Sequence, residues 1–81
     1  MKIRIAMFAS ARDLAQAREV EVELQDGATV ADMRSELAKQ IPQILDLLSR
    51  SSISIDQKYA DDSEVLNPNC EVALIPPVSG G

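Results

Sequence analysis

The chain contains no histidine, no tryptophan, a single cysteine and only two aromatic side chains, Phe8 and Tyr59, among its 81 residues. Without imidazole or a second thiol, an internal disulfide, a Cys/His zinc site and a catalytic dyad or triad that uses histidine are excluded. Because large rings are nearly absent, the core has to be built from Ile, Val, Leu, Met and Ala. The composition therefore indicates that most of the machinery for any reaction is supplied by another protein.

Positive charge is also scarce, because 8 basic side chains face 13 acidic ones and the formal net charge is −5. Such a surface repels phosphate backbones, so no nucleic-acid partner is expected. Apolar runs are far shorter than the roughly 20 residues of a membrane-spanning helix, and residues 1–20 lack the apolar core of a secretory signal. We therefore expect no membrane partner, a cytoplasmic location and one small domain over residues 1–81.

Two segments near the N-terminus alternate in the way that strands do. Residues 2–8 place Ile3, Ile5 and Met7 on one face, and residues 19–24 alternate glutamate with valine or leucine. Antiparallel pairing of the two segments would set Lys2 and Arg4 among the glutamates on the solvent face, where opposite charges attract. The charge pattern and the hydrophobic pattern thus predict the same strand pair.

Two N-cap signals predict helices. Ser10 is the expected cap of a short helix within residues 10–17. Thr29, with Asp32 three residues later, is the expected cap of a main helix over residues 30–40. The apolar positions that this helix should turn toward a sheet are Val30, Met33, Leu37, Ala38 and Ile41.

The second half of the chain is predicted to return to the sheet. Pro42 ends the main helix and begins a short one, whose inward stripe is expected to be Ile44, Leu45 and Leu48. Short strands are expected near residues 53–56 and 58–60. Residues 71–76 are apolar at nearly every position, which predicts a strand in the middle of the sheet. The order of elements indicates an α+β fold in which a sheet wraps one main helix.

The last six residues, 76–81, carry the most informative functional signal. Gly80 and Gly81 are two of only three glycines in the sequence. Pro76 and Pro77 are expected to hold the chain extended beyond the last strand, so that a slim tail can enter a narrow channel in another protein. A carboxylate at its end needs activation, for example by ATP, and a partner has to supply that activation because the chain has no phosphate-binding glycine-rich loop. An inert, tolerant terminus is the alternative that remains open.

Other candidate residues carry weaker signals. Cys70 has no basic neighbour in sequence that would activate its thiol, so we interpret it as a turn or edge residue. Asp61, Asp62 and Glu64 lack the spacing of a calcium loop, and no metal site is expected. Phe8 adds apolar area to the charged face of the first strand, which makes it a candidate partner contact, although a core or rim position is equally compatible with the pattern.

Three segments together resemble a known family. Residues 8–14, Phe-Ala-Ser-Ala-Arg-Asp-Leu, are similar to its Phe-Ala-x-x-Arg-(Glu/Asp)-Leu pattern, and Thr29 opens the main helix as it does there. The end, Pro-Pro-Val-Ser-Gly-Gly at residues 76–81, is the most specific match. Over essentially its full length, the chain resembles the small subunits of molybdopterin synthase, which are sulfur carriers with a ubiquitin-like β-grasp fold.

The resemblance implies a sequence of reactions in which this chain is a co-substrate. A ubiquitin-activating-type adenylyltransferase would use ATP to adenylate the carboxyl of Gly81, and a sulfur-donor protein would convert it to a thiocarboxylate. The tail would then enter the large subunit of the synthase, within a heterotetramer, and pass sulfur to cyclic pyranopterin monophosphate. The catalytic groups would belong to the large subunit, and this chain would bind no cofactor. The residues expected to bind the partner are Phe8, Leu74, Ile75, Pro76, Pro77, Val78 and Ser79, while Gly80 keeps the tail slim.

Two departures from the family pattern produce further expectations. The turn before the last strand reads Asn-Pro-Asn-Cys at residues 67–70 and lacks the usual glycine, so Asn69 is expected to adopt the left-handed conformation. Leu74 and Ile75 stand where relatives often carry phenylalanine.

Three alternative functions remain: a ubiquitin-like modifier joined to lysines, a sulfur carrier for thiamine synthesis or tRNA thiolation, and an interaction module with an inert tail.

Overall fold

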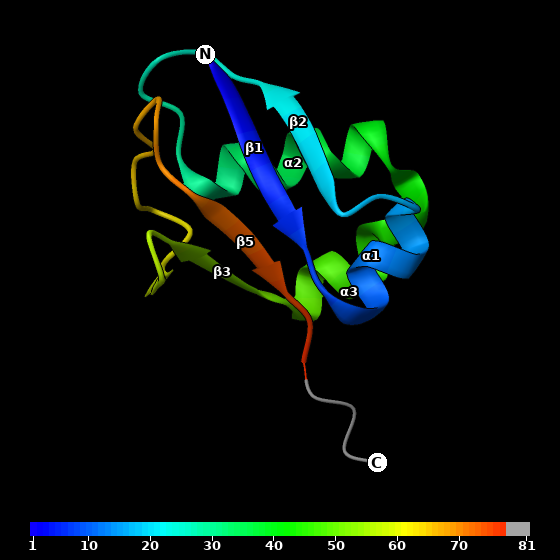
Figure 1. The fold of residues 1–81 in the computed structure, drawn as a ribbon. Helices are drawn as coiled ribbons and strands as arrows, with labels where there is room; N and C mark the ends of the chain where they lie inside the picture. The colour runs from blue at the N-terminus through cyan, green and yellow to red at the C-terminus, as the bar shows by residue number, and fades with distance from the viewer. Residues whose placement is uncertain (78–81) are drawn as a thin grey trace.

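The computed structural model describes residues 1–77 and contains one mixed sheet of five strands (Figure 1). The strands are β1 (Lys2–Met7), β2 (Glu19–Glu23), β3 (Ser52–Ile55), β4 (Lys58–Ala60) and β5 (Val72–Ile75). Their order in the sheet is β2-β1-β5-β3-β4, with β5 parallel to β1 and antiparallel to β3. The central position predicted for the last strand is confirmed, and each predicted strand is present with its ends shifted by no more than one residue.

The helices are α1 (Ala9–Ala15), α2 (Val30–Gln40), a 3-10 turn η1 (Pro42–Ile44) and α3 (Leu45–Arg50). The bounds of α2 are those predicted for the main helix. This helix crosses behind β1 and β2 in Figure 1, and its Val30, Met33 and Leu37 side chains are fully buried. They belong to one cluster with Ile3, Ile5, Met7, Ala11, Val22, Ile44, Leu47, Leu48, Ile53, Leu66, Val72 and Leu74. The core is therefore aliphatic, as the scarcity of aromatic residues required.

The start of α2 is fixed by a capping box. The Asp32 backbone N–H donates to Thr29 Oγ1 at 3.3 Å, and the Thr29 backbone N–H donates to Asp32 Oδ2 at 2.9 Å. These bonds satisfy donors that the first turn of a helix leaves without intrahelical partners. The predicted cap at Thr29 is confirmed.

The prediction that Ser10 caps the first helix is wrong. Phe8 is the N-cap of α1, with extended backbone angles and no side-chain cap hydrogen bond, and the helix already includes Ala9 and Ser10. The helix ends at Ala15 because Gln16 adopts a left-handed conformation with φ 56°. The chain thus turns from β1 into α1 immediately, with Ala9 itself at a φ of 49°.

The predicted inward stripe of the short helix is wrong at Leu45, which is 58% exposed, whereas Leu47 is buried. Residues three and four apart share one side of a helix. Because Ile44 is fully buried at the end of η1, the inward side continues through Leu47 and Leu48 and turns Leu45 outward.

The turn before β5 also differs from the prediction. Asn69 is not among the residues with positive φ within 1–77. The turn is closed by the Cys70 backbone N–H, which donates to the carbonyl oxygen of Asn67 at 3.2 Å. Proline at the second position of such a turn suits a type I geometry, in which no residue needs positive φ. Pro68 therefore makes the missing glycine unnecessary.

Candidate functional site at the exit of the central strand

The central strand β5 leads directly into the proline pair. Its neighbours β1 and β3 hold it on both sides, with Leu74 opposite Met7 of β1 and Ile53 of β3. Pro76 is half-buried and Pro77 is exposed. The chain therefore leaves the sheet from its central strand, which gives the proline pair a rigid base. The predicted site residues Val78, Ser79, Gly80 and Gly81 lie outside the described residues.

Leu74 is 0% exposed and belongs to the core, so the prediction that its side chain contacts a partner is wrong. Side chains of a strand alternate between the two faces of the sheet. Ile75, the next residue, therefore faces away from the core, and it is half-buried. At this strand end the outer face presents Ile75 rather than Leu74.

Phe8 lies at the same end of the sheet. Because β1 and β5 are parallel and pair Met7 with Leu74, the register places Phe8 beside Ile75. Phe8 has an extended backbone, φ −120° and ψ 150°, which continues the alternation of β1 and puts its side chain on the outer face. It is 51% exposed, and an exposed aromatic residue at the root of the tail is suited to a partner contact.

Two further residues adjoin this surface and were missed by the sequence-based predictions. Ser52 pairs with Ile75 across β3 and β5, and Ala73 lies two residues before Ile75 on the same face. Both have small side chains, so the side chain of Ile75 stands above its neighbours on the outer face of the sheet. The Ser-Ile-Ser-Ile alternation of residues 52–55 is the signal that places Ser52 on the face opposite the buried Ile53, and Ser52 is exposed.

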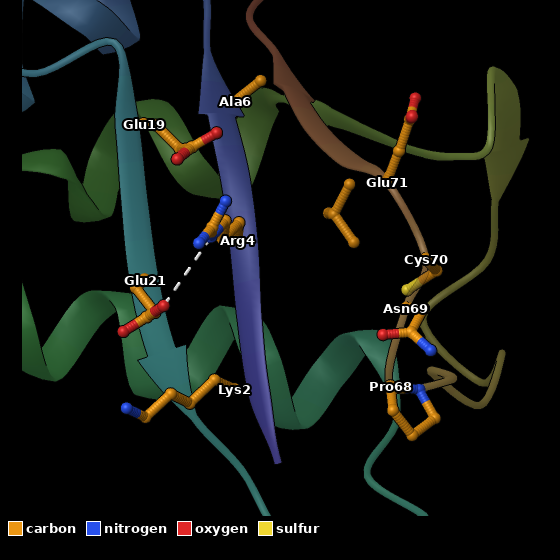
Figure 2. Close-up of a pocket in the computed structure, with 10 residues that line it drawn as sticks. Lys2, Arg4, Ala6, Glu19, Glu21, Pro68, Asn69, Cys70 and Glu71 are labelled. Carbon is orange, nitrogen blue, oxygen red and sulfur yellow. Dashed lines mark ion pairs between the residues drawn. The ribbon is translucent and has the colours of Figure 1, made fainter.

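A shallow hollow of about 640 Å³ lies farther along the outer face, between β2 and the segment before β5 (Figure 2). Arg4 Nε lies 3.8 Å from Glu21 Oε2 across its floor, which confirms the predicted meeting of strand charges. Both side chains are exposed to solvent, Arg4 more than Glu21, so the pair contributes little to stability. The hollow is lined by Lys2, Arg4, Ala6, Glu19, Glu21, Pro68, Asn69, Cys70, Glu71 and Val72.

Cys70 borders this hollow as a half-buried free thiol. Within residues 1–77, no three His, Cys, Asp or Glu side chains are grouped so that they could hold a metal ion. None of the helices in that range is long and apolar enough to cross a membrane.

Comparisons with known proteins agree with this architecture. Haloferax volcanii SAMP1 superposes with a TM-score of 0.88 at 26% identity, and all of both chains is covered. A Pyrococcus furiosus protein described as molybdopterin converting factor, subunit 1, superposes with a TM-score of 0.85 at 29% identity, with 96% of this chain and 99% of that chain covered. In a Helicobacter pylori complex of subunits 1 and 2 of molybdopterin-converting factor, a chain only 16% identical to this one shares the fold, with a TM-score of 0.71 and full coverage of both chains.

The molecule is thus a ubiquitin-like β-grasp protein, as the family resemblance implies, and the α+β sheet around one main helix that the order of elements predicts is confirmed. Residues 5–81 match the model of the ThiS family, and the chain belongs to that family. Among its relatives is the molybdopterin synthase sulfur carrier subunit of Chlamydomonas reinhardtii, which is 34% identical with all of both chains covered.

Proposed function

We propose that this chain is the sulfur carrier subunit of a molybdopterin synthase and that Gly81 carries the sulfur as a thiocarboxylate. The observation that carries the proposal is the full-length similarity to the Chlamydomonas sulfur carrier subunit, together with the Pro-Pro-Val-Ser-Gly-Gly end. The acceptor in this proposal is cyclic pyranopterin monophosphate, which receives two sulfur atoms in two cycles of the carrier.

The described residues support the role of the tail as a delivery arm. β5 is held by neighbours on both sides and passes into two prolines, which favour an extended chain. A rigid base reduces the conformational freedom lost when the tail enters a partner. Phe8 and Ile75 at the root of the tail supply apolar surface against which the partner can close.

The chemistry starts from a carboxylate that does not react with nucleophiles until it is activated. Adenylation by ATP releases pyrophosphate and leaves an acyl-adenylate on Gly81. The terminal sulfur of a donor persulfide then displaces AMP and forms an acyl disulfide. A second thiol reduces that disulfide, which releases the thiocarboxylate and leaves a disulfide on the donor. Transfer of the sulfur and hydrolysis return the carboxylate. This chain contributes the carboxyl group and a narrow glycine end, while the partners contribute the acid, base and nucleotide-binding groups.

The proposal therefore includes three partners: a large synthase subunit, a ubiquitin-activating-type adenylyltransferase and a sulfur-donor protein. The Helicobacter pylori complex is a precedent for the first of these, since a chain of the same fold binds subunit 2 there. We also place the carrier in the cytoplasm, because its activation consumes ATP.

Intact mass spectrometry of the chain isolated without reducing agents tests the proposal. A thiocarboxylate replaces one oxygen by sulfur and adds about 16 Da, which fragmentation has to locate on Gly81. A ladder of isopeptide adducts on lysines of other proteins would instead indicate a modifier. A chain that shows neither change after incubation with ATP, an adenylyltransferase and a sulfur donor would support the inert-tail alternative.

A further inference from the structure

Among the described residues 1–77, strand β2 forms one edge of the sheet and pairs only with β1. The Met7 N–H bonds to the Arg18 carbonyl and the Leu24 N–H bonds to the Met1 carbonyl, both at 2.8 Å. Hydrogen-bonded pairs alternate along an antiparallel ladder. Residues 20 and 22 therefore exchange bonds with β1, whereas the N–H and C=O groups of residues 19, 21 and 23 point away from it.

These outward backbone groups are largely unused. Along this edge the only hydrogen bond within residues 1–77 is a long one of 3.5 Å, from Gln40 Nε2 to the Glu21 carbonyl oxygen. Its direction agrees with the alternation, because Gln40 approaches from α2 on the side opposite β1. The other outward groups of β2 are available for pairing with an additional strand, as edge strands in general are.

The side chains along the β2 edge determine which charge a strand that pairs with it should carry. Glu19, Glu21 and Glu23 all project from the outer face at alternate positions of β2 and are exposed. Glu21 and Glu23 each have one cationic neighbour, at 3.8 and 3.5 Å, while Glu19 lies opposite Ala6. A hollow beyond the end of β2 continues the negative charge, since Glu23, Asp26, Asp32 and Glu36 line it beside a single Lys39.

A second copy of this chain does not fit the edge. Two antiparallel β2 strands would set glutamates directly opposite glutamates, and like charges in that position are destabilising. The same glutamates would attract lysine or arginine in a partner strand. The edge therefore disfavours self-association and favours a basic segment.

We propose that the β2 edge is a docking site for an extended basic segment of another protein, which adds to the sheet as a sixth, antiparallel strand. The segment carries Lys or Arg at alternate positions, directly opposite Glu19, Glu21 and Glu23 on the outer face. Its backbone meets the outward N–H and C=O groups of those glutamates and replaces the contact from Gln40. This inference is independent of the proposed sulfur chemistry, because it involves neither the tail nor β5.

The geometry sets a strict rule for the partner backbone. Residues directly opposite each other in an antiparallel pair share a face and share the same hydrogen-bonding phase. The basic residues must therefore turn their own backbone N–H groups toward β2, while the residues between them turn theirs to solvent. Methylation of the backbone nitrogens of the basic residues should therefore block binding, whereas methylation of the backbone nitrogens of the residues between them should leave binding unchanged.

The test uses the full chain and three versions of a short peptide in which lysine and threonine alternate. We expect the unmodified peptide to bind and to slow hydrogen exchange at the amides of Glu19, Glu21 and Glu23, with little change at Val20 and Val22. N-methylation of the lysines should weaken binding at least about tenfold, because several backbone hydrogen bonds are lost. N-methylation of the threonines adds as many methyl groups and should leave binding close to that of the unmodified peptide.

Charge is tested by a matched pair of double variants. Glu19→Lys with Glu21→Lys should weaken peptide binding at least about tenfold through repulsion. Asp13→Lys with Asp46→Lys makes the same change in net charge at exposed helix positions and should bind nearly as the natural chain does.

Several outcomes would overturn the proposal. Equal affinity for the two methylated peptides, or binding that leaves the three glutamate amides unprotected, would mean nonspecific attraction between opposite charges. Absence of binding by the unmodified peptide would overturn it as well. The peptide comparison uses the natural chain, so it stays decisive if a glutamate variant fails to fold, and no readout depends on sulfur transfer.

Discussion

Arg34 Nη1 lies 2.6 Å from the carbonyl oxygen of Leu48, which joins the middle of α2 to the last turn of α3. The same guanidinium donates from Nη2 to the Ser51 carbonyl at 2.9 Å and from Nε to Asp62 Oδ1 at 2.8 Å. The last carbonyls of a helix have no partners within it, so this side chain completes the hydrogen bonding of α3. The planar, forked guanidinium of Arg34 thus connects α2 with the end of α3 and with Asp62 in the loop after β4.

Replacing Arg34 by alanine should lower the free energy of unfolding by about 1 to 3 kcal/mol, because partly buried carbonyls lose charged donors. Arg34→Lys should recover only part of this loss, since an ammonium group does not reproduce the fork. Urea unfolding measures both effects. Arg50→Ala is the matched control: its pair with Asp46 is highly exposed, and a change under about 0.5 kcal/mol is expected. Equal losses in the Arg34 and Arg50 variants would contradict this role of the fork.

Leu37 and Leu45 offer a test of the packing. Leu37→Ala should destabilise the protein by roughly 2 to 4 kcal/mol, because Leu37 is fully buried and its removal leaves a cavity. Leu45→Ala removes the same atoms from an exposed position and should change stability by less than about 0.5 kcal/mol. Thermal or urea unfolding compares the two directly. An unmoved midpoint for Leu37→Ala would show that the register of α2 is wrong.

The capping box at Thr29 should be worth about 1 kcal/mol, the usual cost of replacing such a cap by alanine. Thr29→Ala removes the acceptor for the Asp32 N–H, whereas Thr29→Ser keeps the hydroxyl and should stay within a few tenths of a kcal/mol of the natural chain. Urea midpoints and hydrogen exchange at Asp32 measure the effect. If serine and alanine destabilise equally, the hydroxyl is not the stabilising group.

Most of the fold can be predicted from the sequence because patterns within single segments determine most of the helices and strands. Strict alternation identified β2, and the Thr29 signal with helical spacing gave the bounds of α2, because in both segments the side chains and the backbone favour the same structure. The errors arose where a neighbouring element sets the geometry. The sequence does not show that Leu45 points outward, because the phase of α3 depends on the preceding turn. It does not show that Leu74 is in the core, because an apolar strand does not reveal which face is covered.

The candidate site shows the same division. The sequence identified Phe8 and the proline pair by residue type, but the proximity of Phe8 to Ile75 depends on the parallel pairing of strands more than 60 residues apart. No local pattern predicts such a register. The sequence also does not predict that one edge of β2 is free, since alternation predicts a strand but not the number of its neighbours.

The sulfur-carrier proposal makes its sharpest prediction at the end of the chain. Deleting Gly81 should leave the urea midpoint unchanged, because the described residues 1–77 already build a buried core cluster from both faces of the helix–sheet contact, yet abolish sulfur transfer by removing the activated carboxyl position. Gly80→Val should impair transfer similarly, since a β-branched side chain restricts the backbone and widens the tail, and Gly80→Ala should fall between valine and glycine. Residues added after Gly81 should also abolish sulfur transfer, because the carboxyl group of Gly81 is then part of a peptide bond. The assay is conversion of cyclic pyranopterin monophosphate by the synthase reconstituted with its large subunit. Near-normal conversion by the chain lacking Gly81 would refute the sulfur-carrier function and leave an interaction module with an inert tail as the remaining interpretation.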